Sequence, residues 1–198
     1  MARKTKERRE ELRERLIDIA EARVAENGIG ALRARDLATE AGCALGAIYN
    51  VFDDMTGLVL AVNGRTFRRL GADVSAEVAK VVEDAPIERL VTMARAYLAF
   101  AAENPRLWRG LFEVEMSVEQ DVPAWYMDEL GRLFSIIAAP LAEMYPEKPA
   151  TEIDLMTRAL FSSVHGIVLL GLEKRISGVP LERIEEQIDF LLRSATRP

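Results

Sequence analysis

Residues 28–58 read GIGALRARDLATEAGCALGAIYNVFDDMTGL, and this stretch decides the fold of the chain. It predicts two short helices joined by a tight turn and followed by the start of a longer helix. The first helix carries Asp36-Leu37-Ala38, the turn is Ala41-Gly42, and the second helix runs from Leu45 to Phe52. A short helix after a glycine-containing turn is the geometry that lets a protein lay one helix in the DNA major groove. The stretch therefore predicts a helix-turn-helix.

Helical spacing is the only regular pattern in the rest of the sequence. A first helix is expected to end near Gly28, and Pro140 is expected to bend a later helix or end it early. The other expected helices cover 56–83, 86–103, a segment from 104, a segment from 121, 151–175 and 181–194. We therefore predict an all-α chain of about nine helices, with a three-helix helix-turn-helix domain at 1–57 and a larger helical bundle at 58–198.

The charge of the chain is unevenly distributed. Its 198 residues carry a formal net charge of −6, which excludes a protein that coats nucleic acid over its whole surface but allows a local basic face. Residues 1–15 hold seven Lys or Arg against four Glu. They form either a solvated helix start, with pairs such as Glu11–Arg15, or a basic arm that reaches phosphate. The neighbouring helix-turn-helix favours the arm.

The sequence offers little to a catalytic or metal site. One cysteine, Cys43, and one histidine, His165, provide no disulfide, no structural zinc site and no Cys–His pair at a suggestive spacing. Glu113 and Glu115 point to different faces of a helix, and no glycine-rich phosphate loop follows a strand. The N-terminus has no apolar segment, and no run of eighteen apolar residues occurs. We therefore expect a cytoplasmic protein that is not an enzyme, binds no metal or cofactor and is not attached to a membrane.

The helix-turn-helix resembles that of the tetracycline-repressor (TetR) family of bacterial transcription regulators. Family members show a Gly-terminated first helix, an Arg-Asp-Ile/Leu-Ala segment, an Ala-Gly turn, a Gly-x-Ile/Leu-Tyr recognition helix and a following Phe. The matching residues here, without insertion, are Gly28, Arg35-Asp36-Leu37-Ala38, Ala41-Gly42, Gly46-Ala47-Ile48-Tyr49, Phe52 and Leu58. A weaker match lies at residues 161–167, where Val164-His165-Gly166 resembles a Trp-His-Gly motif of one branch.

The resemblance implies a C-terminal domain at 58–198 that binds a small effector and dimerises through its last two helices, here 151–175 and 181–194. Three residues depart from the family pattern. Ala44 replaces the Ser or Thr that caps the recognition helix, and Met55 replaces a Lys that meets the DNA backbone. Arg33 stands where Ser or Thr often starts the preceding helix. A lost cap costs about 0.5–2 kcal/mol, so other basic groups are expected to supply more of the affinity.

In a helix-turn-helix domain, contacts to the DNA backbone hold the protein in register, and side chains of the recognition helix read base edges. The candidate phosphate contacts are Arg3, Lys4, Lys6, Arg33, Arg35 and Tyr49. The candidate base readers are Leu45, Ala47 and Asn50, and Gly46 allows close approach. The Asn50 amide suits adenine, while the apolar side chains suit the thymine methyl group. Ile48 is expected in the core, and a core position is the alternative for Tyr49.

A second site is expected in an apolar cavity of the bundle, lined by aromatic and methionine side chains. The candidates are Met93, Tyr97, Phe100, Trp108, Phe112, Met116, Trp125, Tyr126 and Phe134, with His165 as a hydrogen-bond donor. For each of them ordinary core packing is the alternative, and for His165 that alternative is a packed, hydrogen-bonded position at a helix–helix contact.

These features predict a ligand-responsive repressor that acts as a homodimer. It would bind a palindromic double-stranded DNA operator and release it when a small hydrophobic or aromatic effector binds. The alternative is an all-helical protein that binds a small molecule or a partner and has weak or lost DNA affinity. Ala44, Met55 and the negative net charge favour this alternative. An enzyme acting in the aromatic cavity is a third interpretation.

Overall fold

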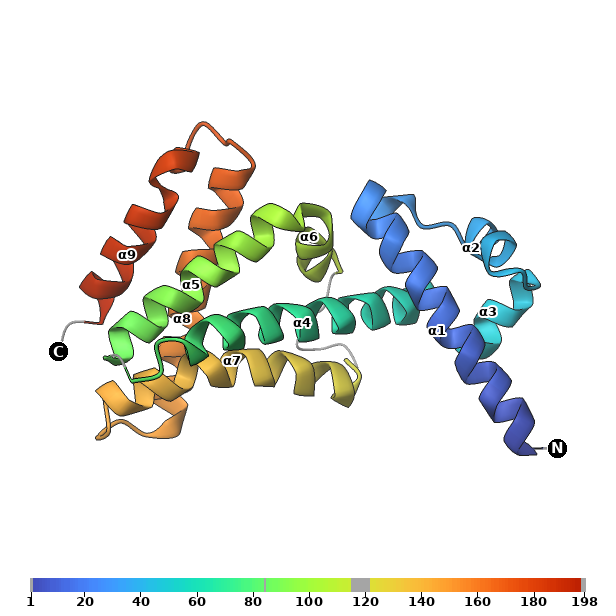
Figure 1. Cartoon of the computed structure of the whole chain (residues 1–198), viewed down its shortest axis with the longest axis horizontal. Coiled ribbons are helices and arrows are strands. Elements are labelled where there is room, and N and C mark those ends of the chain that lie inside the picture. Colours follow the sequence, from blue (N-terminus) through green and yellow to red (C-terminus); the bar gives the residue numbers. More distant parts are fainter. Residues whose placement is uncertain (1, 84, 115–121, 197–198) are drawn as a thin grey trace. The chain divides into compact units, whose positions relative to one another are not determined.

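In a computed structural model, which describes residues 2–83, 85–114 and 122–196, every regular element is a helix (Figure 1). The elements are α1 (Ala2–Asn27), η1 (Ile29–Ala31), α2 (Ala34–Ala41), α3 (Leu45–Val51), α4 (Met55–Ala79), α5 (Pro86–Glu103), α6 (Pro105–Glu113), α7 (Ala124–Met144), α8 (Ala150–Leu172), η2 (Leu181–Arg183) and α9 (Ile184–Ala195). These ranges contain nine α-helices and no strand, which confirms the all-α fold.

Two glycines with positive φ follow the ends of α1 and α2. Gly28, at φ +80°, follows α1 and donates its N–H to the carbonyl oxygen of Val24 at 2.8 Å. Gly42, at φ +66°, follows α2, and the next N–H, that of Cys43, donates to the Ala38 carbonyl oxygen at 2.9 Å. A side chain strains this backbone region, so glycine is favoured at both positions. Both predicted stops are confirmed.

Several boundaries differ from the expected ones. Helix α4 ends at Ala79 rather than near residue 83, and α8 ends at Leu172 rather than near residue 175. The last segment begins with the 3₁₀ turn η2 before it becomes α9. Pro140 does not end its helix, because α7 continues to Met144.

The chain divides into two compact units. The first comprises Met1–Arg68 and Asn104–Tyr126, and the second comprises Arg69–Glu103 and Met127–Pro198. We call the first unit the head and the second unit the bundle. Helix α4 contributes its N-terminal part to the head and its C-terminal part to the bundle. The predicted domain boundary between residues 57 and 58 stays a prediction.

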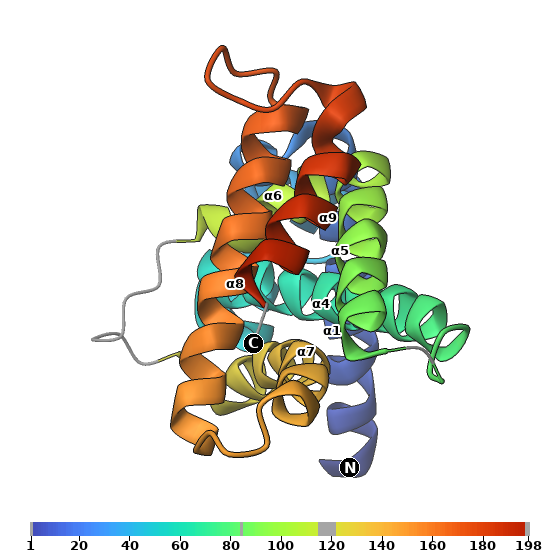
Figure 2. The ribbon, with the colours of Figure 1, turned by 90° about the vertical axis from the view of Figure 1, so that its left-hand side faces the viewer.

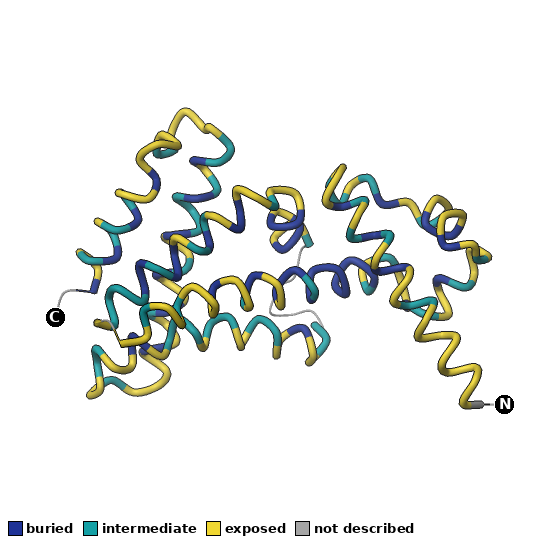
Figure 3. The backbone as a smooth tube through the Cα atoms, in the orientation of Figure 1, coloured by how far each residue is buried: buried dark blue, intermediate teal, exposed yellow. Residues whose placement is uncertain are grey.

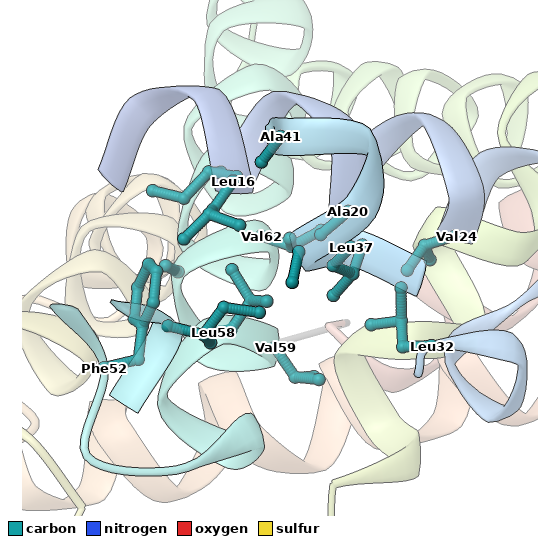
Figure 4. Close-up of a cluster of buried hydrophobic side chains, with 14 of the residues drawn as sticks. Leu16, Ala20, Val24, Leu32, Leu37, Ala41, Phe52, Leu58, Val59 and Val62 are labelled. Carbon is teal, nitrogen blue, oxygen red and sulfur yellow. The ribbon is translucent and has the colours of Figure 1, made fainter. Parts of the chain in front are cut away.

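The head is built around one apolar core that five α-helices share (Figure 4). Leu16 of α1, Leu37 of α2, Ile48 of α3 and Leu58 of α4 are each 0% exposed, and Leu107 of α6 joins them. Residues 58–64 of α4 are all buried, as the dark blue part of that helix shows in Figure 3. Burial of one such side chain contributes about 1.5–3 kcal/mol, so this core holds α2 and α3 in place.

Charged side chains also join α1 to α4 within the head. Arg65 of α4 contacts Glu14, Asp18 and Glu21, whose spacing places them on one face of α1. The guanidinium donates to Glu14 Oε2 at 2.6 Å, Asp18 Oδ1 at 2.5 Å and Glu21 Oε2 at 3.1 Å. Burial lowers the pKa of Arg65, but these hydrogen bonds outweigh it and raise the pKa above its ordinary value. We call these four residues the Arg65 cluster.

In the bundle, α5 packs on α8 and α9, and α8 packs on α9 (Figure 2). The inner faces of these helices are apolar, with Val168 of α8 and Ile188 of α9 at 0% exposure. Helix α8 is also long and apolar enough to cross a membrane by length and composition alone.

Candidate DNA-binding surface and effector cavity

Helix α3 presents one face to the core of the head and the other to solvent. Ile48 anchors it at 0% exposure, as predicted, whereas Leu45 is 41% and Tyr49 48% exposed. Gly46 and Asn50 are also exposed, and Ala47 is half-buried. The structure therefore brings the predicted base readers together on one short helix, with Tyr49 among them rather than in the core.

The starts of α2 and α3 lack side-chain caps. Ala44 is the N-cap residue of α3 and Arg33 that of α2, and neither side chain bonds to the first turn of its helix. The Arg33 guanidinium is exposed and donates to the carbonyl oxygens of Gly30 at 2.7 Å and Leu32 at 2.9 Å. Arg33 thus braces the segment before α2 while its charge remains at the surface.

The basic N-terminal residues belong to the first turns of α1. Arg3, Lys4 and Lys6 are all exposed, and Arg3 Nε pairs with Glu7 Oε1 at 2.9 Å. Arg15 donates to the carbonyl oxygen of Ala41 at 3.2 Å, so it secures the end of α2. Arg35 is exposed on α2. Both interpretations of the basic segment have support here, since it is a solvated helix that also presents cations.

The bundle contains a cavity of about 90 Å³. Its lining comes from α4, α5, α7, α8 and α9 and is apolar almost throughout. The lining residues are Leu70, Val74, Leu90, Met93, Ala94, Tyr97, Leu133, Ile136, Ile137, Leu160, Phe161, Val164 and Leu192. Such walls suit an apolar ligand.

A hydrogen bond between α5 and α8 lies beside this cavity. The Tyr97 hydroxyl and His165 Nδ1 are 2.8 Å apart, and the His165 ring stacks on Phe161 with centroids 5.7 Å apart. Burial lowers the pKa of His165, which favours the neutral ring. His165 is not among the lining residues, so its geometry matches the packed, hydrogen-bonded alternative.

The structure does not bring the ten predicted ligand residues together. Met93 and Tyr97 line the cavity, whereas Phe134 lines a separate groove between α7 and α8. Phe100 is buried, and the Arg69 guanidinium lies 5.7 Å from the centroid of its ring. Trp108, Phe112, Trp125 and Tyr126 belong to the head, where they pair as Trp108–Phe112 and Trp125–Tyr126. Met116 lies outside the described residues.

Most of the lining is aliphatic and was missed by sequence reasoning. Leu70 and Val74 come from α4, and Ile136 and Ile137 from α7. Their helical spacing marks them as buried but does not distinguish a cavity wall from packed core. Aromatic and methionine content was therefore a poor guide to the cavity.

A short helix with an exposed outer face, held after a glycine turn on the packed core of the head, defines a helix-turn-helix DNA-binding protein. Residues 16–62 match the family model of bacterial regulatory proteins of the tetR family. Residues 90–195 match the model of a tetracyclin repressor-like C-terminal domain. The chain belongs to the TetR family of transcription regulators. The resemblance and the expectation that the chain is not an enzyme are thereby confirmed.

Sequence relatives agree with this family. Two uncharacterised HTH-type transcriptional regulators of Mycobacterium tuberculosis are each 34% identical to this chain over 94 residues. The alignment covers 48% of this chain and 46% of each relative, so the chain spans about half the length of the relatives that it matches.

Solved structures share the fold over nearly the whole chain. A protein of unknown function from Rhodococcus sp. RHA1 has a TM-score of 0.75 at 22% identity, covering 94% of this chain and 96% of its own. RolR, in complex with its ligand resorcinol, has a TM-score of 0.69 at 22% identity and covers 97% and 96%. FadR from Bacillus subtilis, in complex with stearoyl-CoA, has a TM-score of 0.69 at 17% identity and covers 91% and 97%.

Proposed function

We propose that this regulator is a homodimeric, cytoplasmic repressor that leaves a palindromic operator when a small hydrophobic or aromatic effector enters the cavity of the bundle. The observation that carries the DNA-binding part is the outer face of α3. Leu45 and Tyr49 are 41% and 48% exposed there, although the head buries Leu37 of α2 and Ile48 of α3. In the proposed complex Tyr49 and Arg35 contact phosphates, while Leu45, Ala47 and Asn50 read bases.

The outer faces of α8 and α9 support the homodimer. Leu155 and Leu170 of α8 are 66% and 38% exposed, and Phe190 of α9 is 67% exposed. Only 22% of the most apolar window of α8 is buried in the single chain. Exposed apolar side chains along two helices favour an interaction surface, and a two-fold interface would bury them against the same helices of the partner. The dimer would present two α3 helices to successive major grooves.

The cavity supports the effector part. RolR and FadR carry resorcinol and stearoyl-CoA in their structures, which favours a small-molecule ligand for this chain as well. A ligand that prefers the conformation with low DNA affinity would release the operator by population shift.

A gel-shift titration of the purified protein on DNA flanking its own coding region tests this proposal. We expect salt-sensitive binding, with a slope that reflects the number of phosphate contacts. Asn50→Ala should weaken binding to the specific fragment, whereas Glu103→Ala, an exposed change in the bundle, should not. Binding that is absent at low salt on every flanking fragment would favour the alternative, an all-helical protein that binds a ligand or a partner.

A further inference from the structure

The walls of the bundle cavity exclude charge. Every lining residue is Ala, Val, Leu, Ile, Met, Phe or Tyr. A carboxylate, phosphate or ammonium group placed there would lose its hydration without gaining a partner of opposite charge. Desolvating an unpaired ion is among the most unfavourable steps in protein chemistry. The cavity therefore selects against ionised ligands.

The one polar side chain of the lining is already engaged. The Tyr97 hydroxyl lies 2.8 Å from His165 Nδ1, so a strong hydrogen bond to the ligand would compete with the contact between α5 and α8. The neutral His165 ring provides no cation for an anionic ligand. A ligand therefore gains mainly from apolar contact.

The size of the cavity sets a second limit. A dry apolar cavity of about 150 Å³ holds benzene, and the cavity here is about 90 Å³. A six-membered ring thus requires a small displacement of the walls, which Met93, with its flexible side chain, can provide. An acyl chain of many carbons requires a far larger displacement.

We propose that the effector is an uncharged, hydrocarbon-like molecule about as large as one six-membered ring with a short substituent. This inference rests on the proposed role of the cavity as the effector site. It narrows the hydrophobic or aromatic class to compounds without a carboxylate, a phosphate or a long chain.

Four probes separate charge from size in titrations of the full-length protein without DNA. Benzene and toluene are expected to bind and to raise the Tm. Benzoate, which has the ring of toluene but carries a charge, is expected to bind at least about a hundredfold more weakly. Butylbenzene, uncharged but longer, is also expected to bind more weakly than toluene. Benzoate binding as tightly as toluene, butylbenzene binding more tightly than toluene, or no binding of either small hydrocarbon would overturn the proposal.

A matched pair of variants on α5 locates the binding. Ala94 lines the cavity and Ala99 is exposed on the same helix. Ala94→Leu fills the cavity and should lower toluene affinity about tenfold or more, whereas Ala99→Leu should leave it unchanged. If Ala94→Leu lowers the Tm of the ligand-free protein, Val74→Leu provides a smaller filling change. Unchanged toluene affinity in both cavity variants contradicts the assignment.

Release of DNA is measured separately. If toluene binds the free protein in the cavity but leaves its DNA complex intact, the ligand class stands and the effector role of the cavity fails. If benzoate alone releases DNA, the protein is still regulated by an effector, but the ligand class proposed here fails.

Discussion

Arg65→Met tests how firmly the head holds α1 on α4. The change keeps an apolar stem and removes the guanidinium shared by Glu14, Asp18 and Glu21. The Arg65 side chain is 23% exposed, and those of the three acids are 49%, 66% and 28% exposed, respectively. Pairs at such partly exposed positions contribute about 0.2–1 kcal/mol each. Like charges left at i,i+3 and i,i+4 add about 0.2–0.5 kcal/mol of repulsion per pair.

The expected loss of unfolding free energy is therefore about 2 kcal/mol. For a chain of this size the Tm should fall by roughly 4–8 °C. Urea unfolding of the full-length protein at low salt measures the difference, and high salt should reduce it because the pairs are partly exposed. We also expect weaker DNA binding, since α1 supports α2 and α3 through the shared core.

Lys80→Met is the matched control. Lys80 lies just beyond α4, in the turn that follows it, and pairs with Glu77 at 2.6 Å, with both side chains about half exposed or more. Its loss should cost no more than about 0.5 kcal/mol. If Arg65→Met is no more destabilising than Lys80→Met, or if its effect does not depend on salt, the Arg65 cluster does not stabilise the head as argued.

Three further predictions address DNA, the dimer and pH. Arg35→Ala should lower the slope of log K against log salt by about one unit in gel shifts, and an unchanged slope would mean that Arg35 touches no phosphate. Phe190→Glu should convert the proposed dimer to a monomer in sedimentation experiments, while Ser194→Glu on the same helix should not; a dimer that survives both changes argues against α9 as the interface. Burial lowers the pKa of His165 in the folded state. The unfolded chain therefore takes up a proton first, so stability should fall as the pH drops from about 7 to about 5. His165→Gln should flatten that fall in urea titrations, and an identical slope in the variant would show that other groups cause it.

Local signals predicted the helix boundaries well where backbone chemistry determines them. Gly28 and Gly42, both at positive φ, follow the ends of α1 and α2, and helices α5 and α6 begin at Pro86 and Pro105. Pro140 shows the limit of such signals, because α7 continues through it. An interior proline removes one backbone hydrogen bond from a helix and kinks or breaks it, so its position alone does not fix where the helix ends.

The grouping of helices was beyond sequence reasoning. Residues 104–126 read as one more amphipathic part of the bundle, yet Leu107 joins the core of the head. Asn63 of α4 donates to the Gly110 carbonyl oxygen at 2.8 Å across this contact. The same helical spacing of apolar residues recurs along the whole chain. This spacing shows that each helix has an apolar face, but it does not show which two helices pack together. For this reason the pattern placed Trp108 and Phe112 in the cavity, although they belong to the head.

The sharing of α4 has a practical consequence for anyone who wishes to isolate the DNA-binding part. A fragment that stops at residue 57 lacks Leu58, Val59 and Val62, which occupy the centre of the head, and lacks Leu107 from a distant part of the chain. Such a fragment would expose its apolar interior and is expected to be insoluble or unfolded. Exchanging heads between related regulators would thus require transplanting α6 together with the N-terminal segment. The unit that reads DNA is continuous in space and interrupted in sequence.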